Sequence, residues 1–192
     1  MVNTENFENV EVTSARQLRE WLEMHHTQEE SVWLVTYKKQ VGAHYVSVQE
    51  VLDEVLCFGW IDGVRRKLDD QRTMQLIGPR RVEHWAKSYK DRADLLTKEG
   101  RMSAAGLHAI SESKRTGLWN FMDDVDALEF PDDLIGALRA HPGSAHHFER
   151  FPASSKRFVL RWIKVSKTPE TRARRIQTTA LLAAQNQRIP GS

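Results

Sequence analysis

Apolar residues near the start of the chain follow a helical spacing first and a strand spacing next. Leu18 and Leu22 lie one turn apart after Ser14, which stands three residues before Gln17 in a capping-box pattern, so a helix is predicted there. Residues 32–37, with the sequence VWLVTY, are rich in β-branched and aromatic side chains. This composition predicts a strand.

A second helix and a pair of strands are predicted next. The helix begins with another capping box, Ser47 with Glu50, and ends near Gly59. Its apolar face consists of Val48, Val51, Leu52, Val55 and Leu56. Residues 61–68 and 73–77 predict two short strands joined by a turn. The first part of the chain is therefore predicted to be α+β, with helices and a small mixed or antiparallel sheet.

Beyond Gly78 and Pro79 the apolar spacing becomes helical. Helices are predicted over 83–99, 103–117 and 131–138, from Ser154 or Ser155 onward, and over 168–187. The last helix begins with Thr-Pro-Glu, which supplies a cap oxygen, a proline where no N–H is needed, and an acid at the positive end of the helix dipole. We expect an α+β domain over 1–118 and a helical, basic region over 119–192 packed on it, with one domain overall as the alternative.

Composition places the chain among ordinary soluble globular proteins. Of its 192 residues, 40% are hydrophobic and 28% charged, which is enough apolar content for a core. The N-terminus carries no signal-peptide pattern, and no apolar run approaches the roughly 20 residues that a membrane helix needs. Cys57 is the single cysteine, so no internal disulfide forms. A cytoplasmic location without membrane insertion is the expectation.

The net charge of +2 is unevenly distributed. Residues 150–192 hold ten basic residues and one acid, whereas the stretch 123–133 is acidic. Arg157, Arg161 and Lys164 form one helical stripe, and Arg172 and Arg175 lie one turn apart. Such stripes can follow the phosphates of a nucleic acid, which makes a nucleic-acid or ribosome-associated protein one alternative. The other alternative is internal pairing with the acidic stretch.

The most informative motif is CFGWIDG at 57–63, where a helix should end and a strand begin. Trp60 and Asp62 stand two apart, so on a strand they project to the same face. Arg65 and Arg66 follow on the same strand, the next strand ends at Arg80 and Arg81, and Trp85 comes after them. A carboxylate, guanidinium groups and an indole in one cleft would suit an anionic or aromatic ligand. The alternative is structural: an Asp–Arg pair that fixes strand register beneath a core tryptophan.

These patterns define the candidate site. The predicted ligand-binding residues are Trp60, Asp62, Arg80, Arg81 and Trp85, with Thr171, Arg172 and Arg175 as an extension. In this hypothesis Asp62 orients the arginines, the arginines take the negative charge, and a tryptophan stacks. The competing hypothesis is an enzyme that uses Asp62 as general acid or base in the same cleft.

Other reactive side chains carry weaker signals. Cys57 stands at the negative end of a predicted helix, which disfavours its thiolate and favours a buried thiol. His141, His146 and His147 match no zinc spacing, so a polar loop and no metal site are predicted there. The chain contains neither a Walker loop nor a dinucleotide fingerprint, and no cofactor is expected.

Several blocks together resemble the YdeI/OmpD-associated, or bacteriocin-protection, family. They are CFGWIDG itself, the strand from Trp33 to Lys39, Pro79-Arg80-Arg81 with Trp85, Gly100-Arg101-Met102 with Gly106, and 167–176, KTPETRARRI. Glu83-His84 departs from the small polar residue that the family has before its tryptophan. The resemblance implies a role in bacteriocin or envelope stress, and no particular reaction. The lead hypothesis is therefore a stress-related protein that binds an anionic ligand or partner.

Overall fold

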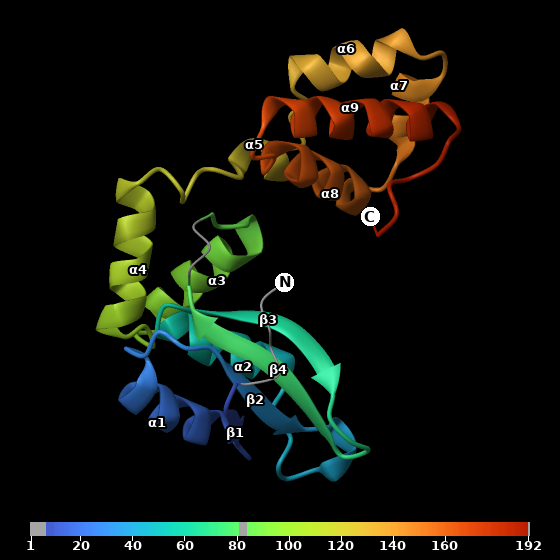
Figure 1. Ribbon diagram of the computed structural model, residues 1–192. Coiled ribbons are helices and arrows are strands. Elements are labelled where there is room, and N and C mark those ends of the chain that lie inside the picture. Colours follow the sequence, from blue (N-terminus) through green and yellow to red (C-terminus); the bar gives the residue numbers. More distant parts are fainter. Residues whose placement is uncertain (1–6, 81–83, 192) are drawn as a thin grey trace. The chain divides into compact units, whose positions relative to one another are not determined.

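The structure is a computed structural model that describes residues 7–80 and 84–191 (Figure 1). The chain divides into two compact units, residues 1–120 and 121–192. The first unit combines a four-stranded sheet with helices, and the described part of the second consists of helices and loops. The fold class is α+β, as the sequence predicts. Among the described residues, no helix is both long and apolar enough to cross a membrane.

The first unit contains four strands and four α-helices within its described residues. In chain order they are β1 (Asn9–Glu11), α1 (Ala15–His25), β2 (Val32–Tyr37), the 3₁₀ turn η1 (Lys39–Val41), α2 (Val48–Cys57), β3 (Trp60–Lys67), β4 (Arg72–Pro79), α3 (Lys87–Lys98) and α4 (Ala104–Arg115). The sheet order is β1-β2-β4-β3, with β1 parallel to β2 and the other pairs antiparallel. The predicted mixed sheet is thus confirmed.

The core of the first unit lies between the sheet and its helices. Ser14 caps α1 by accepting the N–H of Gln17, and Ser47 and Glu50 form a complete capping box at the start of α2. The helices bury one face each. The core side chains with no more than 1% exposure include Leu18, Leu22, Val32, Leu34, Val51, Val55, Leu56 and Ile77.

A β-bulge changes the direction of the side chains along β3. Asp62 lies opposite Ile77, but Arg65 lies opposite Gln75, so the pairing shifts by one residue between them. Ile77 and Gln75 share one face of β4, which brings Asp62 and Arg65 to that same face. Three residues apart in a regular strand, these two side chains would point to opposite faces.

The CFGWIDG motif joins the end of α2 to its neighbours through tight backbone contacts. Gly59 has φ +72°, and a Cβ there would lie 3.2 Å from the carbonyl oxygen of Ala105. The carbonyl of Cys57 accepts hydrogen bonds from Ser103, from its N–H at 3.0 Å and its hydroxyl at 2.7 Å. A Cβ on Gly106 would lie 2.3 Å from that same oxygen. The motif therefore holds α4 directly against α2.

The second unit is built around its last helix. Its elements are α5 (Asp123–Asp126), α6 (Asp132–Ala140), α7 (Ser144–Arg150), α8 (Ala153–Lys164) and α9 (Pro169–Ala184). Helix α9 contacts α6, α7 and α8, as Figure 1 shows for this unit. Its start is the predicted one, with the Thr168 hydroxyl accepting the N–H of Thr171. Leu134, Phe148, Ile163 and Ala180 are buried in its core.

Several sequence predictions in the helices are wrong in detail. Helix α8 begins at Ala153 after Pro152, so neither predicted serine caps it, and Ser155 is buried inside the helix. The segment predicted as a polar histidine loop forms α7, because Gly143 with φ +78° turns the chain into a new helix. Helix α3 begins at Lys87 rather than at Glu83, a residue outside the described ones.

Candidate anion-binding site

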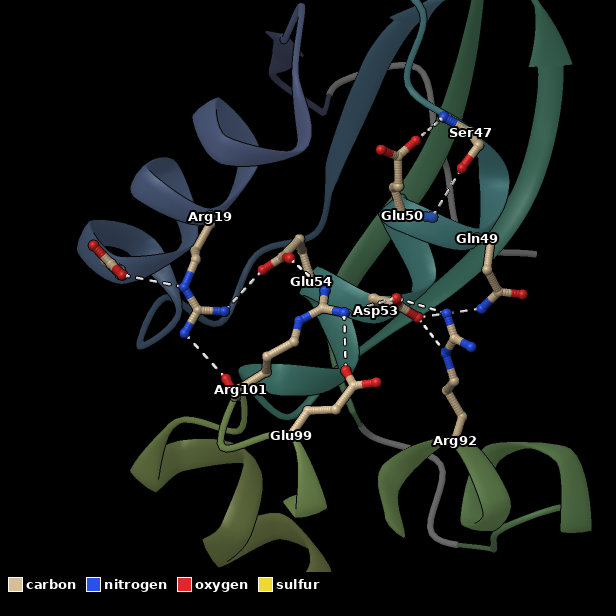
Figure 2. Close-up of polar contacts among 10 residues, drawn as sticks. Arg19, Ser47, Gln49, Glu50, Asp53, Glu54, Arg92, Glu99 and Arg101 are labelled. Atoms are coloured by element: carbon tan, nitrogen blue, oxygen red, sulfur yellow. Dashed lines mark hydrogen bonds and ion pairs between the residues drawn. The ribbon is translucent and has the colours of Figure 1, made fainter. Parts of the chain in front are cut away.

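The first unit contains a closed network of buried charges on α2, shown in Figure 2. Asp53 and Glu54 are consecutive residues with only 4% and 5% exposure. Asp53 accepts two hydrogen bonds from Arg92, through Nε and, at 2.6 Å, Nη2. Glu54 accepts one from Arg19 at 3.0 Å and one from Arg101 at 2.8 Å. Both carboxylates are thus satisfied by charged donors.

This network connects parts of the unit that are far apart in sequence. Arg19 belongs to α1 and Arg92 to α3, while Arg101 lies between α3 and α4 and also reaches Asp53 at 3.3 Å. Arg19 donates in addition to the backbone carbonyl of Arg101 at 3.0 Å. Because every charge has a partner inside the protein, the network fixes helices and offers little to a ligand.

Cys57 lies next to this network and is fully buried. Burial, together with the neighbouring Glu54 carboxylate, raises the pKa of the Cys57 thiol to about 11. The side chain is therefore a neutral thiol near neutral pH, as expected for a buried cysteine. A role as a nucleophile would require the opposite shift.

A second cluster of polar side chains lies around Asp62, and we call it open because some of its donors have no hydrogen-bond partner among the described residues. The Asp62 carboxylate accepts hydrogen bonds from Gln75 Nε2 at 2.9 Å and from the Tyr89 hydroxyl at 2.6 Å. Gln75 in turn accepts a hydrogen bond from Arg65 Nη2 at 2.6 Å. The bulge in β3 makes this chain of contacts possible, because it places Arg65 and Asp62 on either side of Gln75.

Arg80 belongs to the same cluster and is held by aromatic rings. Its guanidinium carbon lies 3.8 Å from the ring centre of Trp85 and 5.5 Å from that of Tyr89. Nη2 donates to the carbonyl of His84 at 3.0 Å. Trp85 is itself fixed by a hydrogen bond from Nε1 to the hydroxyl of Ser113 at 2.7 Å. The guanidinium plane is thereby held in one orientation.

Three N–H groups of this cluster are buried without a hydrogen-bond partner among residues 7–80 and 84–191. They are Nε of Arg65 and both Nε and Nη1 of Arg80. Burial lowers the pKa of Arg80 to about 10, against the attraction of Tyr89 and Asp62. Burial also lowers the pKa of Arg65. The cluster, which we call the Arg80 cluster, thus holds two partly desolvated cations with donors to spare.

The structure brings together only some of the residues predicted for the site. Asp62, Arg80 and Trp85 lie in the Arg80 cluster, whereas Trp60 lies in the core. Trp60 is 1% exposed, donates from Nε1 to the carbonyl of His26 at 2.9 Å and packs edge-on against Trp21. Arg81 lies outside the described residues. Thr171, Arg172 and Arg175 belong to the second unit.

Sequence reasoning missed Gln75 and Tyr89, and it named Arg65 next to the cleft without including it among the predicted site residues. Gln75 carried a usable signal, because it is a polar residue between the apolar Met74 and Leu76 of a predicted strand. A regular strand would have pointed Arg65 away from Asp62, and the bulge in β3 is what brings the two to one face. Tyr89 could not be linked to Asp62, because the partner of its hydroxyl is 27 residues away in sequence.

Residues 10–109, just over half of the chain, match the family described as Domain of unknown function (DUF8412). The chain belongs to this family. Residues 127–186 match the family described as Bacteriocin-protection, YdeI or OmpD-Associated, which confirms the resemblance that the motifs indicated. The blocks from Trp33 to Gly106 fall in the first match and the KTPETRARRI block in the second. No curated protein and no solved structure matches the chain.

In the region matched by the YdeI/OmpD-associated family and just before it, acidic residues pair with the basic helices. Lys164 donates to both carboxylate oxygens of Asp124 at 2.6 Å, and Arg172 binds Asp133 through Nε at 2.7 Å and Nη2 at 2.9 Å. Arg172 lowers the pKa of the Asp133 carboxyl. The internal pairing proposed as an alternative is therefore present.

The other three of the five basic residues, Arg157, Arg161 and Arg175, differ in their contacts. Arg175 donates to the carbonyl of Trp162, and its guanidinium carbon lies 5.0 Å from the Trp162 ring centre. Arg157 makes only a 3.4 Å contact with the carbonyl of Asp126, and Arg161 is exposed. Among these five positions, Arg157 and Arg161 are the most open to solvent.

Proposed function

We propose that the first unit binds a small anion, of the size of phosphate or a carboxylate, at the Arg80 cluster. The observation that carries this proposal is the set of buried, unpartnered N–H groups on Arg65 and Arg80, counted over the residues that the structure describes. An unpaired buried donor costs about 1–3 kcal/mol, and more when it is charged. A bound anion would recover this cost through charge-assisted hydrogen bonds.

The local charges support the same conclusion. Arg65 and Arg80 are both attracted by Asp62, whose two oxygens are already bonded to the neutral donors Gln75 and Tyr89. Among the described residues of the cluster, one carboxylate thus faces two guanidinium groups. A single further negative charge would balance the cluster. The network on α2 needs no such addition, because its arginines are already paired with carboxylates of the protein.

Each residue has a distinct role in this proposal. Arg80 and Arg65 supply the donors, Trp85 and Tyr89 fix the plane of Arg80, and Gln75 spaces Arg65 from Asp62. Trp85 is 1% exposed, so its ring stacks on Arg80 and not on a ligand. This favours a simple anion over an aromatic one, and a binding protein over an enzyme that would need Asp62 free. The bacteriocin-protection description of the second family supports extending the proposal to a role in bacteriocin-related stress. The cytoplasmic location in the proposal comes from the sequence, which has one cysteine and no signal-peptide pattern.

The test is anion binding to the full chain. Isothermal titration with inorganic phosphate and with acetate, at an ionic strength held constant with chloride, should give saturable binding of at least one of them. Thermal unfolding should agree, since an anion at ten times its Kd adds about 1.4 kcal/mol. Arg80→Gln should abolish both effects and Arg65→Gln should weaken them. Arg115→Gln, which alters an exposed pair with Glu112, is the matched control and should change neither.

The proposal would be refuted if neither phosphate nor acetate stabilised the protein more than chloride does, or if the anion binding survived Arg80→Gln. The polyanion alternative is tested separately. Arg157→Glu with Arg161→Glu should weaken binding to short RNA or DNA if the two open positions of the stripe contact phosphates. Lys164 and Arg172 need not be changed for that test, because Asp124 and Asp133 already neutralise them.

A further inference from the structure

A pocket of about 230 Å³ lies within the second unit, lined by α5, α8 and α9 and by the loop that follows α5. Val125, Leu160 and Ile163 make its floor apolar. Charged residues of both signs, including Glu129 and Arg172, stand around it. A pocket of this volume is smaller than those that take drug-sized molecules, and it combines an apolar floor with a few convergent polar groups.

Two of the charged groups have bonding capacity to spare. Lys164 and Asp124 also line the pocket, but they pair with each other at 2.6 Å. Arg172 binds Asp133 through Nε and Nη2, which leaves its Nη1 outside the pair. The Glu129 carboxylate has no hydrogen bond or ion pair within the described part of the chain. The pocket therefore presents one available anion and one available cationic donor.

The backbone before Glu129 adopts a conformation unusual for its side chain. Leu128 has φ +60°, a value that favours glycine. Its N–H donates to Val125 at 3.2 Å and that of Glu129 to Asp124 at 2.8 Å, which closes the end of α5 in a left-handed turn. This turn brings Glu129 to the pocket. Leu128 packs against the core of the second unit, which explains how a leucine is accommodated there.

We propose that this pocket binds a free α-amino acid with an aliphatic side chain. The ammonium group would pair with Glu129, the carboxylate would accept from Nη1 of Arg172, and the side chain would lie on Val125, Leu160 and Ile163. A zwitterion is selected because the Glu129 carboxylate lacks a cationic partner among the described residues, and Nη1 of Arg172, whose charge is already paired with Asp133, is a donor outside that pair. An anion alone would leave Glu129 unpaired, and an amine alone would leave Arg172 Nη1 without an acceptor.

The probe is L-leucine, titrated into the full chain and followed by isothermal titration and by NMR of backbone amides. Leucinamide lacks the carboxylate and N-acetyl-leucine lacks the ammonium group, and they also represent the two ends of a peptide. Leucine should bind with a Kd of about 1 mM or tighter, and each derivative at least about tenfold more weakly. Amides of Val125, Leu160 and Ile163 should shift on binding.

Variants separate the two contacts. Glu129→Gln changes a carboxylate without a partner, so the chain should fold normally and bind leucine about tenfold more weakly. Glu149→Gln, an exposed change on α7, is the matched control and should have no effect. Arg172→Gln should weaken leucine and N-acetyl-leucine alike. Because it also removes the pair with Asp133, Asp133→Asn shows what loss of that pair alone does.

Three results would overturn the proposal. The first is the absence of saturable leucine binding up to about 10 mM. The second is equal affinity for leucine and leucinamide, and the third is leucine binding that Glu129→Gln leaves unchanged. Equal affinity for leucinamide would assign the pocket to the N-terminus of a peptide instead. None of these outcomes bears on the Arg80 cluster, which is tested with phosphate.

Discussion

Two groups of arginines and carboxylates in the first unit differ in how their charges are completed. On α2, Asp53 and Glu54 receive charged hydrogen bonds from Arg19, Arg92 and Arg101. In the Arg80 cluster, Asp62 is occupied by Gln75 and Tyr89, and the arginines keep buried donors without a partner among the described residues. The same residue types thus give a structural network in one place and a candidate binding site in the other.

The difference arises from the element that carries the acids. Consecutive residues on a helix point in different directions, so Asp53 and Glu54 reach arginines on different sides of α2 (Figure 2). Asp62 stands alone on a strand, where its neighbours on the same face are Gln75 and Arg65. The cluster whose carboxylates are bonded by arginines of the protein is structural, whereas the cluster with unbonded donors is the candidate for binding a ligand.

The largest expected effect is the removal of a charge from the closed network. Asp53→Asn should lower the free energy of unfolding by about 3 kcal/mol, because Arg92 loses its buried partner. Urea unfolding followed by circular dichroism measures this change. Asp94→Asn, an exposed change on α3, should stay within about 0.5 kcal/mol. Equal values for the two variants would mean that the network does not fix the helices.

The contact between α2 and α4, which supports the network, should be nearly as sensitive. Gly106→Ala places a Cβ 2.3 Å from the carbonyl oxygen of Cys57, and we expect a loss of about 2 kcal/mol. Gly136→Ala on α6 is the matched change, since a Cβ there meets nothing within 4 Å. It should stabilise the protein by about 1 kcal/mol, because alanine favours a helix. Thermal unfolding of both variants would show opposite signs if these contacts are correct.

The open cluster should respond much less than the closed one. In chloride buffer without phosphate, Arg80→Gln should change the stability by no more than about 1 kcal/mol, because lost stacking is offset by the removal of unpaired buried donors. Arg92→Gln should cost clearly more, since it leaves Asp53 without its main partner. If Arg80→Gln proved the more damaging of the two, the distinction between the clusters would fail.

The smallest effect concerns the pH dependence of the second unit. The Asp133 carboxyl has a pKa lowered below its ordinary 3.8 by Arg172. Its contribution is therefore present above that value and is lost as pH falls through the lower folded-state pKa. Because the pair is half exposed, Asp133→Asn should cost less than about 1 kcal/mol near neutral pH. In unfolding curves measured at decreasing pH, the difference between Asp133→Asn and wild type should narrow as the pH falls below 3.8 and through the lower folded-state pKa. A difference that stays constant over this range would contradict the prediction.

Local signals in the sequence predicted most elements but few of the contacts between them. The capping boxes at Ser14 and Ser47 and the Thr-Pro-Glu start of α9 marked helices that the structure confirms. The start of α8 was missed, because proline can precede a helix without a side-chain cap. These features depend on a few neighbouring residues, so one sequence is enough to find them.

The candidate site was only partly predictable. The motif drew attention to Asp62 and Arg80, but Trp60 proved to be a core residue with a buried hydrogen bond to His26. The single-residue shift in β3 is invisible in the alternation of side chains, and it alone decides that Arg65 joins Asp62. Contacts that depend on such a register shift, or on partners 27 residues apart, require the folded chain.

The same bulge also affects the tendency of the protein to aggregate through the edge of its sheet. Strand β3 lies at one edge of the sheet and the three-residue β1 at the other. A long, flat edge invites another chain to add a strand, which begins aggregation. The extra residue in β3 twists its edge, and Arg66 and Lys67 place charge beside it. We therefore expect that this sheet resists extension by a second molecule, and that deleting Val64 to straighten the strand would make the protein prone to aggregate.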